Sequence, residues 1–150
     1  MKKEAAAMGH VFNIRKVADF SPEGYENAFV SKMLIDSESV GSEKLVMNYF
    51  ALKPGKKTDQ GSHPAPFDEV YYVLRGHAIV YLGESQDAFE IEPDTVVFIP
   101  HNTLHYLVNN GPDELEMITV MPGPMQEGVN SIYDERKKKW GSSFKTKGEI

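Results

Sequence analysis

The chain has 150 residues, a formal net charge of −6 and no cysteine. This length fits one domain, expected over residues 1–150, and can bury a core without disulfides. The lack of cysteine excludes thiolate zinc sites, iron–sulfur clusters and cysteine nucleophiles. The acidic balance argues against nucleic-acid partners, and no apolar run approaches the ~20 residues that cross a bilayer. We therefore expect a cytoplasmic protein with neither a nucleic-acid nor a membrane partner.

Short apolar segments recur between turn signals through the middle of the chain. They are rich in Val, Ile, Tyr and Phe, which favours strands over helices. Many short strands at near-regular spacing are typical of an all-β sandwich or barrel. The sequence therefore predicts a barrel core over about 28–121, preceded by a strand arm at 10–20. The expected core strands are 28–35, 45–52, 70–74, 78–82, 95–99, 104–108 and 115–121.

The C-terminal part, 131–150, has a different pattern and predicts a short helix or tail. Ser131 is a candidate N-cap, and Asp134 three residues later forms a variant of the capping box. We interpret the basic run 136–139 as a solvated face, because cations near a helix C-terminus are favoured by its dipole. A phosphate or acidic-partner contact is the alternative. Trp140 is expected to anchor the tail on the barrel or on a second subunit.

Two polar clusters adjoin the predicted strands and can meet at one point. Residues His63 and Glu69 are six apart, a distance of about 20 Å in an extended chain. The prolines between them demand a bend, so we expect His63 to end one strand and Glu69 to open the next. Facing side chains of paired strands approach to about 5 Å. In the second cluster, His105 projects from the start of its strand after the turn 101–103.

Two neutral imidazoles and one carboxylate suit a divalent metal ion, with Fe, Mn, Ni and Zn all compatible. Taken singly, each side chain is equally well explained as a packed or surface residue. The coincidence of all three with matching turns predicts a metal site at His63, Glu69 and His105. Such sites keep open coordination positions and can polarise a carbonyl, acidify water or bind oxygen.

Tyr71 lies two positions after Glu69 and should share its face of the strand. We predict that its phenol is catalytic and acts as a general acid or base on a bound substrate. An aromatic core residue with a satisfied hydroxyl is the alternative. By the same parity, Val73 and Leu107 should point inward.

The two clusters resemble the paired motifs of the cupin superfamily over about residues 44–121. The resemblance implies a double-stranded β-helix, or jelly-roll, barrel, a small oxygen-rich ligand or substrate and a homodimer, for which the segment 11–17 is a candidate edge strand. Asp94 and Asn102 stand where the family usually has glycines. The matching positions are Pro54 and Gly55 at the opening, Glu69 and Gly76 at the family spacing, and Pro100, His105 and Asn109 in the second motif.

One ligand position departs from the family pattern of three histidines and one glutamate. If His63 is the first of the two clustered histidines, Ala65 replaces the second; if it is the second, Gly61 replaces the first. The side-chain oxygen of Gln60 or Asp59 could fill the gap, and water or substrate could also complete the shell. Gln60 is the predicted extra ligand.

The resemblance implies a metal-dependent enzyme that acts on a small oxygen-rich molecule. Dioxygenase, isomerase or epimerase, and lyase chemistry all remain open, because this fold hosts many activities. The alternative is a non-catalytic barrel with a degenerate metal site that binds or senses a small ligand.

Overall fold

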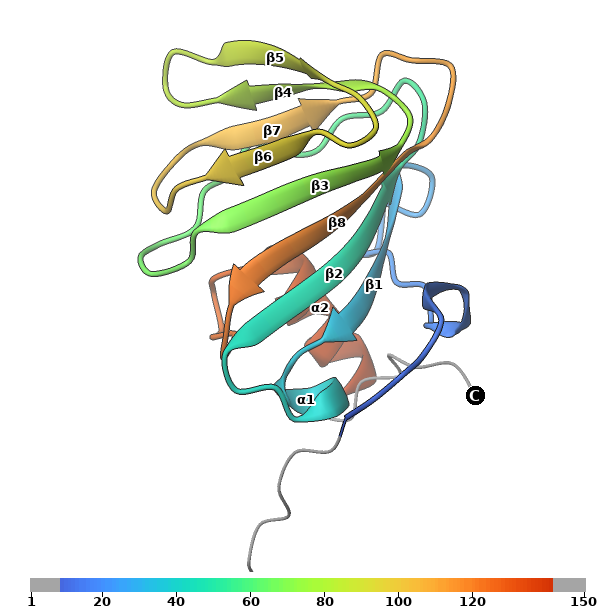
Figure 1. The fold of residues 1–150 in the computed structure, drawn as a ribbon, viewed down its shortest axis with the longest axis vertical. Coiled ribbons are helices and arrows are strands. Elements are labelled where there is room, and N and C mark those ends of the chain that lie inside the picture. The colour runs from blue at the N-terminus through green and yellow to red at the C-terminus, as the bar shows by residue number, and fades with distance from the viewer. Residues whose placement is uncertain (1–8, 142–150) are drawn as a thin grey trace, which may run out of the picture.

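The computed structural model describes residues 9–141 and has two antiparallel sheets with a helix near the C-terminus (Figure 1). The larger sheet has the strand order β1-β2-β8-β3-β6 and the smaller one the order β5-β4-β7. None of the helices within these residues has the length and apolar character needed to span a membrane. The elements are η1 (Ile14–Lys16), β1 (Phe29–Ile35), α1 (Ser37–Val40), β2 (Leu45–Leu52), β3 (Glu69–Arg75), β4 (Ala78–Leu82), β5 (Asp87–Ile91), β6 (Val96–Ile99), β7 (His105–Val108), β8 (Leu115–Pro122) and α2 (Ser131–Trp140).

The all-β jelly-roll fold predicted from the apolar segments and from the motif resemblance is confirmed. Every expected core strand forms, and each agrees with the prediction to within one residue at either end. One strand, β5, was missed. Only Ile91 of its five residues is buried, so the alternation that marks a half-buried strand is absent from this edge strand.

The main core lies between the two sheets. Alternate residues of β3 and β7 turn inward, and Val73 and Leu107 are almost completely buried, as predicted. On β2, Phe50 faces the core, whereas Tyr49 packs on the opposite side of the sheet. The remaining buried members include Leu52, Val80, Ile91, Ile99, Leu115 and Met117.

Helix α2 covers the inner face of the larger sheet where the smaller sheet does not reach, behind β1 and β2 in Figure 1. Its N-cap is Asn130, whose side chain accepts a hydrogen bond from the Tyr133 amide, so the predicted cap at Ser131 was wrong by one residue. The solvated-face interpretation was wrong for Arg136, which is 1% exposed. It holds for 137–139, which are exposed.

Trp140 at the end of α2 anchors the helix on its own barrel. Its ring packs edge-on against Phe20, with the centroids 5.3 Å apart. Trp140 was expected to anchor the tail on the barrel or on a second subunit. Among the described residues, it packs against the barrel.

The N-terminal segment does not form the strand arm predicted at 10–20. It contains the short helix η1, and only Phe20 makes a β-bridge, to Ser31 of β1. Val17, with the partly buried Phe12 and Ile14, packs on the outer face of the larger sheet. Because these apolar side chains are buried or partly buried on their own chain, the segment covers a sheet face instead of adding a strand.

The backbone conformation at three turns explains why glycine, aspartate and asparagine occupy these motif positions. Gly76, between β3 and β4, has φ +83°, and a Cβ there would lie 2.3 Å from the backbone oxygen of Glu114. Only glycine fits such an approach. Asp94 and Asn102, which stand where the family has glycines, have φ of 69° and 60°. Asp and Asn tolerate this left-handed conformation better than other non-glycine residues, so both turns keep their shape.

Candidate metal centre

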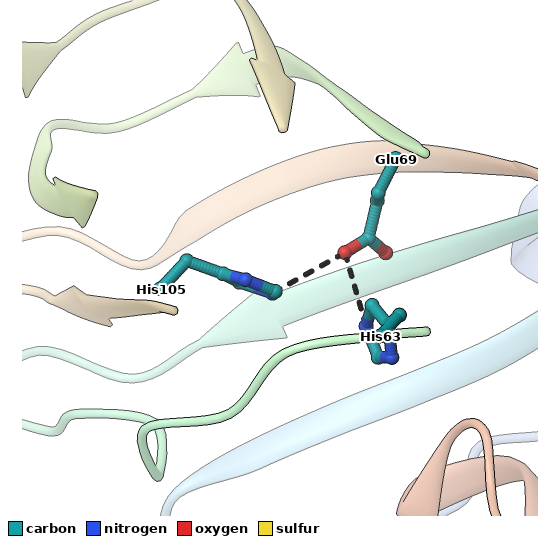
Figure 2. Close-up of side chains that lie close together, drawn as sticks. All are labelled: His63, Glu69 and His105. Atoms are coloured by element: carbon teal, nitrogen blue, oxygen red, sulfur yellow. Dashed lines mark ion pairs between the residues drawn. The ribbon is translucent and has the colours of Figure 1, made fainter. Parts of the chain in front are cut away.

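The three predicted ligands converge from three different segments. Glu69 is the first residue of β3, His105 is the first residue of β7, and His63 lies in the loop between β2 and β3 (Figure 2). The expectation that His63 ends a strand was wrong, because the segment before it forms only isolated bridges, from Lys57 to Val108 and from Gly61 to His105. The loop is held instead by backbone hydrogen bonds, including one of 2.6 Å from the Asn102 amide to the His63 carbonyl.

The geometry of the three side chains suits one small cation. Nε2 of His63 and Nε2 of His105 each lie 3.4 Å from Oε1 of Glu69. One potential ligand atom from each residue lies within 4.8 Å of the other two, and no other such group of three is found in residues 9–141. Glu69 is 5% exposed and His105 is 8% exposed, so the carboxylate and one imidazole are largely removed from water.

Backbone carbonyls fix the tautomer of both imidazoles. His63 Nδ1 lies 2.7 Å from the Val129 oxygen, and His105 Nδ1 lies 2.9 Å from the Thr103 oxygen. A carbonyl can only accept, so each Nδ1 donates a proton, and each neutral ring directs the lone pair of Nε2 toward the carboxylate. Three acceptors therefore face one point. Glu69 Oε1 is buried and has no hydrogen-bond partner, which a bound cation would supply. The residues present fit a divalent metal.

The pKa shifts of Glu69 and His63 agree with this arrangement. Burial raises the pKa of Glu69, but His105 and His63 lower it by more, and the carboxyl stays below its usual range. For His63, burial lowers the pKa, while the hydrogen bond and charge of Glu69, together with the Val129 carbonyl, raise it to a net value above the ordinary one. Without a metal, a proton on His63 can therefore balance the buried carboxylate. A divalent ion would displace that proton.

Tyr71 lies on the inner face of β3 with Glu69, as the strand parity predicted. Its ring is nearly perpendicular to that of His105, and the centroids are 6.2 Å apart. Burial, and then the charge of Glu69, raise the pKa of the Tyr71 phenol well above its usual value. The hydroxyl therefore keeps its proton and can act as a donor toward a molecule in the cavity.

The three ligands open into a cavity of about 330 Å³. This volume is at the small end of the range of ligand pockets, roughly 300–1,000 Å³. Gln60 and Asp59 both line the cavity, and Asp59 accepts a hydrogen bond of 2.7 Å from the Tyr25 hydroxyl. His101 is exposed and pairs with Asp68 at 2.9 Å, outside the group of three.

Sequence reasoning missed the polar residues at the α2 end of the cavity. Ser31, Asn48, Thr119 and Arg136 all line it. Asn48 and Thr119 occupy inward positions of β2 and β8, and polar residues at alternate positions of otherwise apolar strands are a signal that could have identified them. Arg136 carries no such signal, because it begins a run of basic residues.

Comparisons with known proteins agree with the fold and the motifs. The Cupin domain family matches residues 48–121. Auxin-binding protein 1 from Arabidopsis thaliana is 24% identical over 119 residues, which cover 74% of this chain and 59% of that protein. The chain thus spans less than two thirds of the length of this curated relative.

Two solved structures superpose on most of the chain. The polyketide cyclase RemF from Streptomyces resistomycificus has a TM-score of 0.67 at 19% identity and covers 93% of this chain and 99% of its own. KdgF from Halomonas sp. has a TM-score of 0.64 at 20% identity and covers 78% and 96%, respectively. These similarities establish the fold, and the family match falls on the strands that carry Glu69 and His105. The chain belongs to the cupin superfamily.

Proposed function

We propose that this protein is a metal-dependent enzyme acting on a small, oxygen-rich molecule, with a divalent ion held by His63, Glu69 and His105. One observation carries the proposal. Three acceptor atoms, one of them a buried carboxylate oxygen with no partner, converge at the edge of a cavity that is partly open to solvent. Buried acceptors without a donor are costly unless a cation or donor completes them.

Each residue has a separate task in this proposal. A bound divalent ion would supply Lewis acidity toward a substrate oxygen. The carboxylate of Glu69 offsets part of the cation's charge, and the carbonyls of Val129 and Thr103 keep both imidazoles in the ligating tautomer. The Tyr71 phenol donates a proton or a hydrogen bond to an oxygen of the substrate. Leu107 and other apolar lining residues exclude water.

The metal and the reaction class stay open within the proposal. The ligand set suits Fe, Mn, Ni and Zn. Oxygen activation, isomerisation or epimerisation, and elimination by a lyase all use a substrate oxygen bound to such an ion. Gln60 lines the same cavity as the three ligands and is the proposed fourth protein ligand.

Elemental analysis tests the metal site directly. Protein stripped with a chelator and reloaded with Mn²⁺, Fe²⁺, Ni²⁺ or Zn²⁺ should retain close to one ion per chain after dialysis. His105→Ala should retain none, because it loses one of three protein ligands. His101→Ala is the matched control, since its exposed imidazole lies outside the group, and it should bind metal like the wild type. Equal retention by His105→Ala and the wild type would refute the site.

A binding protein without catalysis is the second candidate. Its support is the missing motif histidine, which leaves three protein ligands where the family pattern has four, and a similar curated relative that is named an auxin-binding protein. Mass spectrometry of a molecule that co-purifies with the protein, followed by its incubation with metal-loaded protein, separates the two functions. Unchanged release of that molecule supports binding alone, and its conversion supports an enzyme.

We also propose that the chain forms a homodimer, through a different surface from the N-terminal segment first expected. Strand β6 is an edge of the larger sheet, and Val96 and Phe98 project from it into solvent. Tyr72 and Leu74 of the adjacent β3 are exposed as well. A second copy could cover this apolar face across a twofold axis. Phe98→Lys should then convert a dimer to a monomer on a sizing column; an unchanged elution position contradicts this surface.

A further inference from the structure

We propose that Arg136 binds the carboxylate of a small organic acid whose opposite end lies at His63, Glu69 and His105. This inference rests on the proposed function and deepens it by naming the substrate class. It assigns the anion-binding role to α2, the helix that covers one side of the cavity.

The guanidinium of Arg136 is buried but incompletely partnered. The residue is 1% exposed and lines the cavity. Among residues 9–141, its side chain makes one hydrogen bond, from Nη2 to Ser31 Oγ at 2.7 Å, and Nε is buried with no partner. No carboxylate oxygen of these residues lies within 4.0 Å of it. A guanidinium has five N–H donors, so most of its donors are available.

Asp36 is the buried carboxylate whose charge acts on Arg136. Because Asp36 is not part of the cavity wall, its side chain does not occupy the space available to a ligand. Its Oδ1 accepts the Ser39 amide at 2.7 Å as the cap of α1. Asp36 therefore offsets part of the charge from outside the cavity. Oδ2 of Asp36 is also buried with no hydrogen-bond partner, but no carboxylate of residues 9–141, Asp36 included, forms an ion pair with Arg136.

A carboxylate is the group that best completes such a site. Burying a cation without a paired anion is costly, and the planar fork of arginine matches a carboxylate through two parallel N–H···O bonds. Phe20 stacks near the guanidinium at 5.1 Å and limits its movement. The site is therefore both charged and oriented.

The cavity wall between the two ends sets the shape of the acid. Asn48, Thr119 and Tyr71 are register partners across β2, β8 and β3, and all three line the cavity. Three strand spacings, about 14 Å on a flat sheet, separate β1, which carries Ser31, from β3, which carries Glu69. Phe50 and Met117 make part of the intervening wall apolar. The wall between the two ends therefore carries both polar and apolar side chains, and the geometry favours an acid with oxygens at the end far from its carboxylate.

A purely structural role for Arg136, as an anchor of α2 on β1, makes a different prediction. Loss of the anchor would weaken the fold and the binding of charged and neutral molecules alike. Binding of a carboxylate instead predicts a preference for acids over their uncharged amides. The preference itself, and not the total affinity, is the quantity to measure.

The probes are three catechol acids of increasing length, 3,4-dihydroxybenzoate, 3,4-dihydroxyphenylacetate and 3-(3,4-dihydroxyphenyl)propanoate, each compared with its primary amide. Calorimetric titrations use the full chain, both metal-free and loaded with Zn²⁺. At least one acid should bind the wild type about tenfold or more tightly than its amide, as expected for a charged hydrogen-bonded pair. Arg136→Gln should reduce the acid-to-amide ratio to near one, and Arg136→Lys should keep part of it. Lys138→Gln removes an exposed cation from the same helix and should keep the full ratio.

Several outcomes would overturn the inference: no acid binds the wild type, acids and amides bind alike, or Arg136→Gln keeps the preference. If Arg136→Gln does not fold, NMR of the wild type replaces it. The chain has three arginines, Arg15, Arg75 and Arg136, and the acid should shift the Nε–H signal of Arg136 while the amide does not. Zn²⁺ retention by each variant is measured separately. A preference that depends on Arg136 in protein that retains no metal would refute the metal site and leave the anion site standing.

Discussion

The two ends of the cavity lack partners of opposite charge: one end has buried acceptors without a cation or donor, and the other has buried donors without an anion. At the end formed by β3, β7 and the loop before β3, three acceptors face one another with no donor between them. At the end covered by α2, the Arg136 guanidinium has donors with no anion to accept them. The acceptor end therefore suits a cation, and the α2 end suits an anion. A molecule that spans both must carry its negative charge at the helix end and present neutral or anionic oxygens to the metal.

Replacing Glu69 by Gln removes the only anionic member of the acceptor end and should have the largest effect. We expect Zn²⁺ affinity to fall at least about 100-fold, because one of three ligands loses its charge. The metal-free protein should lose about 1 kcal/mol of its free energy of unfolding, because the lowered pKa of Glu69 shows that the charged carboxylate stabilises the fold, and the neutral amide loses its attraction to the imidazoles. Zn²⁺ titration and urea unfolding measure the two effects.

The exposed carboxylate next in sequence gives the control. Asp68→Asn should leave Zn²⁺ affinity near the wild-type value. In the wild type, free Zn²⁺ at 100 times its dissociation constant should add about 2.7 kcal/mol to the free energy of unfolding, and in Glu69→Gln at the same concentration almost none. Equal stabilisation of both proteins by Zn²⁺ would show that the ion binds elsewhere.

Lowering the pH should weaken metal binding at the acceptor end of the cavity and leave the α2 end unaffected. In the metal-free protein, His63 has a pKa raised above 6.5, because Glu69 and the Val129 carbonyl together outweigh the lowering by burial. A metal must displace that proton, so affinity should level off above the raised pKa and fall below it, by about tenfold per pH unit for one proton. Zn²⁺ titrations from pH 8 to pH 5.5 measure this slope. A flat profile over that range would mean that His63 is not a ligand.

Ser31→Ala should have the smallest effect of these substitutions. It should change the contacts of Arg136 at the α2 end and leave the metal ligands unaffected. The change removes the one acceptor of Arg136, so the free energy of unfolding should fall by about 1 kcal/mol. Zn²⁺ affinity should not change, because Ser31 is on β1 and the ligands are elsewhere. Ser85→Ala, in the exposed turn before β5, is the control for loss of a hydroxyl. A change in Zn²⁺ affinity in Ser31→Ala would show that the two ends are not independent.

The acceptor end was predictable from the sequence because its determinants are local. Glu69 and His105 each open an apolar strand after a turn, and the period of two fixes their inward direction together with Tyr71. The position of His63 was predicted less well. Its loop is held by contacts from Asn102 and Val129, which no pattern around residue 63 encodes.

The α2 end was not predictable because its determinants are distant in the chain. Arg136 contacts Ser31 across 105 positions, and its neighbours 137–139 are exposed, so the local pattern indicates a solvated face. The N-terminal segment shows the same limit. Val17 and Phe12 look like part of a strand, but the sheet face that they cover is created by β1 and β2.

Because α2 supplies Tyr133 and Arg136 to the cavity wall, a ligand that spans the cavity must also hold this helix against β1. Release of the helix and release of the ligand then become one linked equilibrium. Backbone amides of 134–140 should exchange with deuterium more slowly when the cavity is filled, whereas amides of β4, which is remote from α2, should keep their rates. The helix would thus report occupancy of the cavity without any labelled ligand.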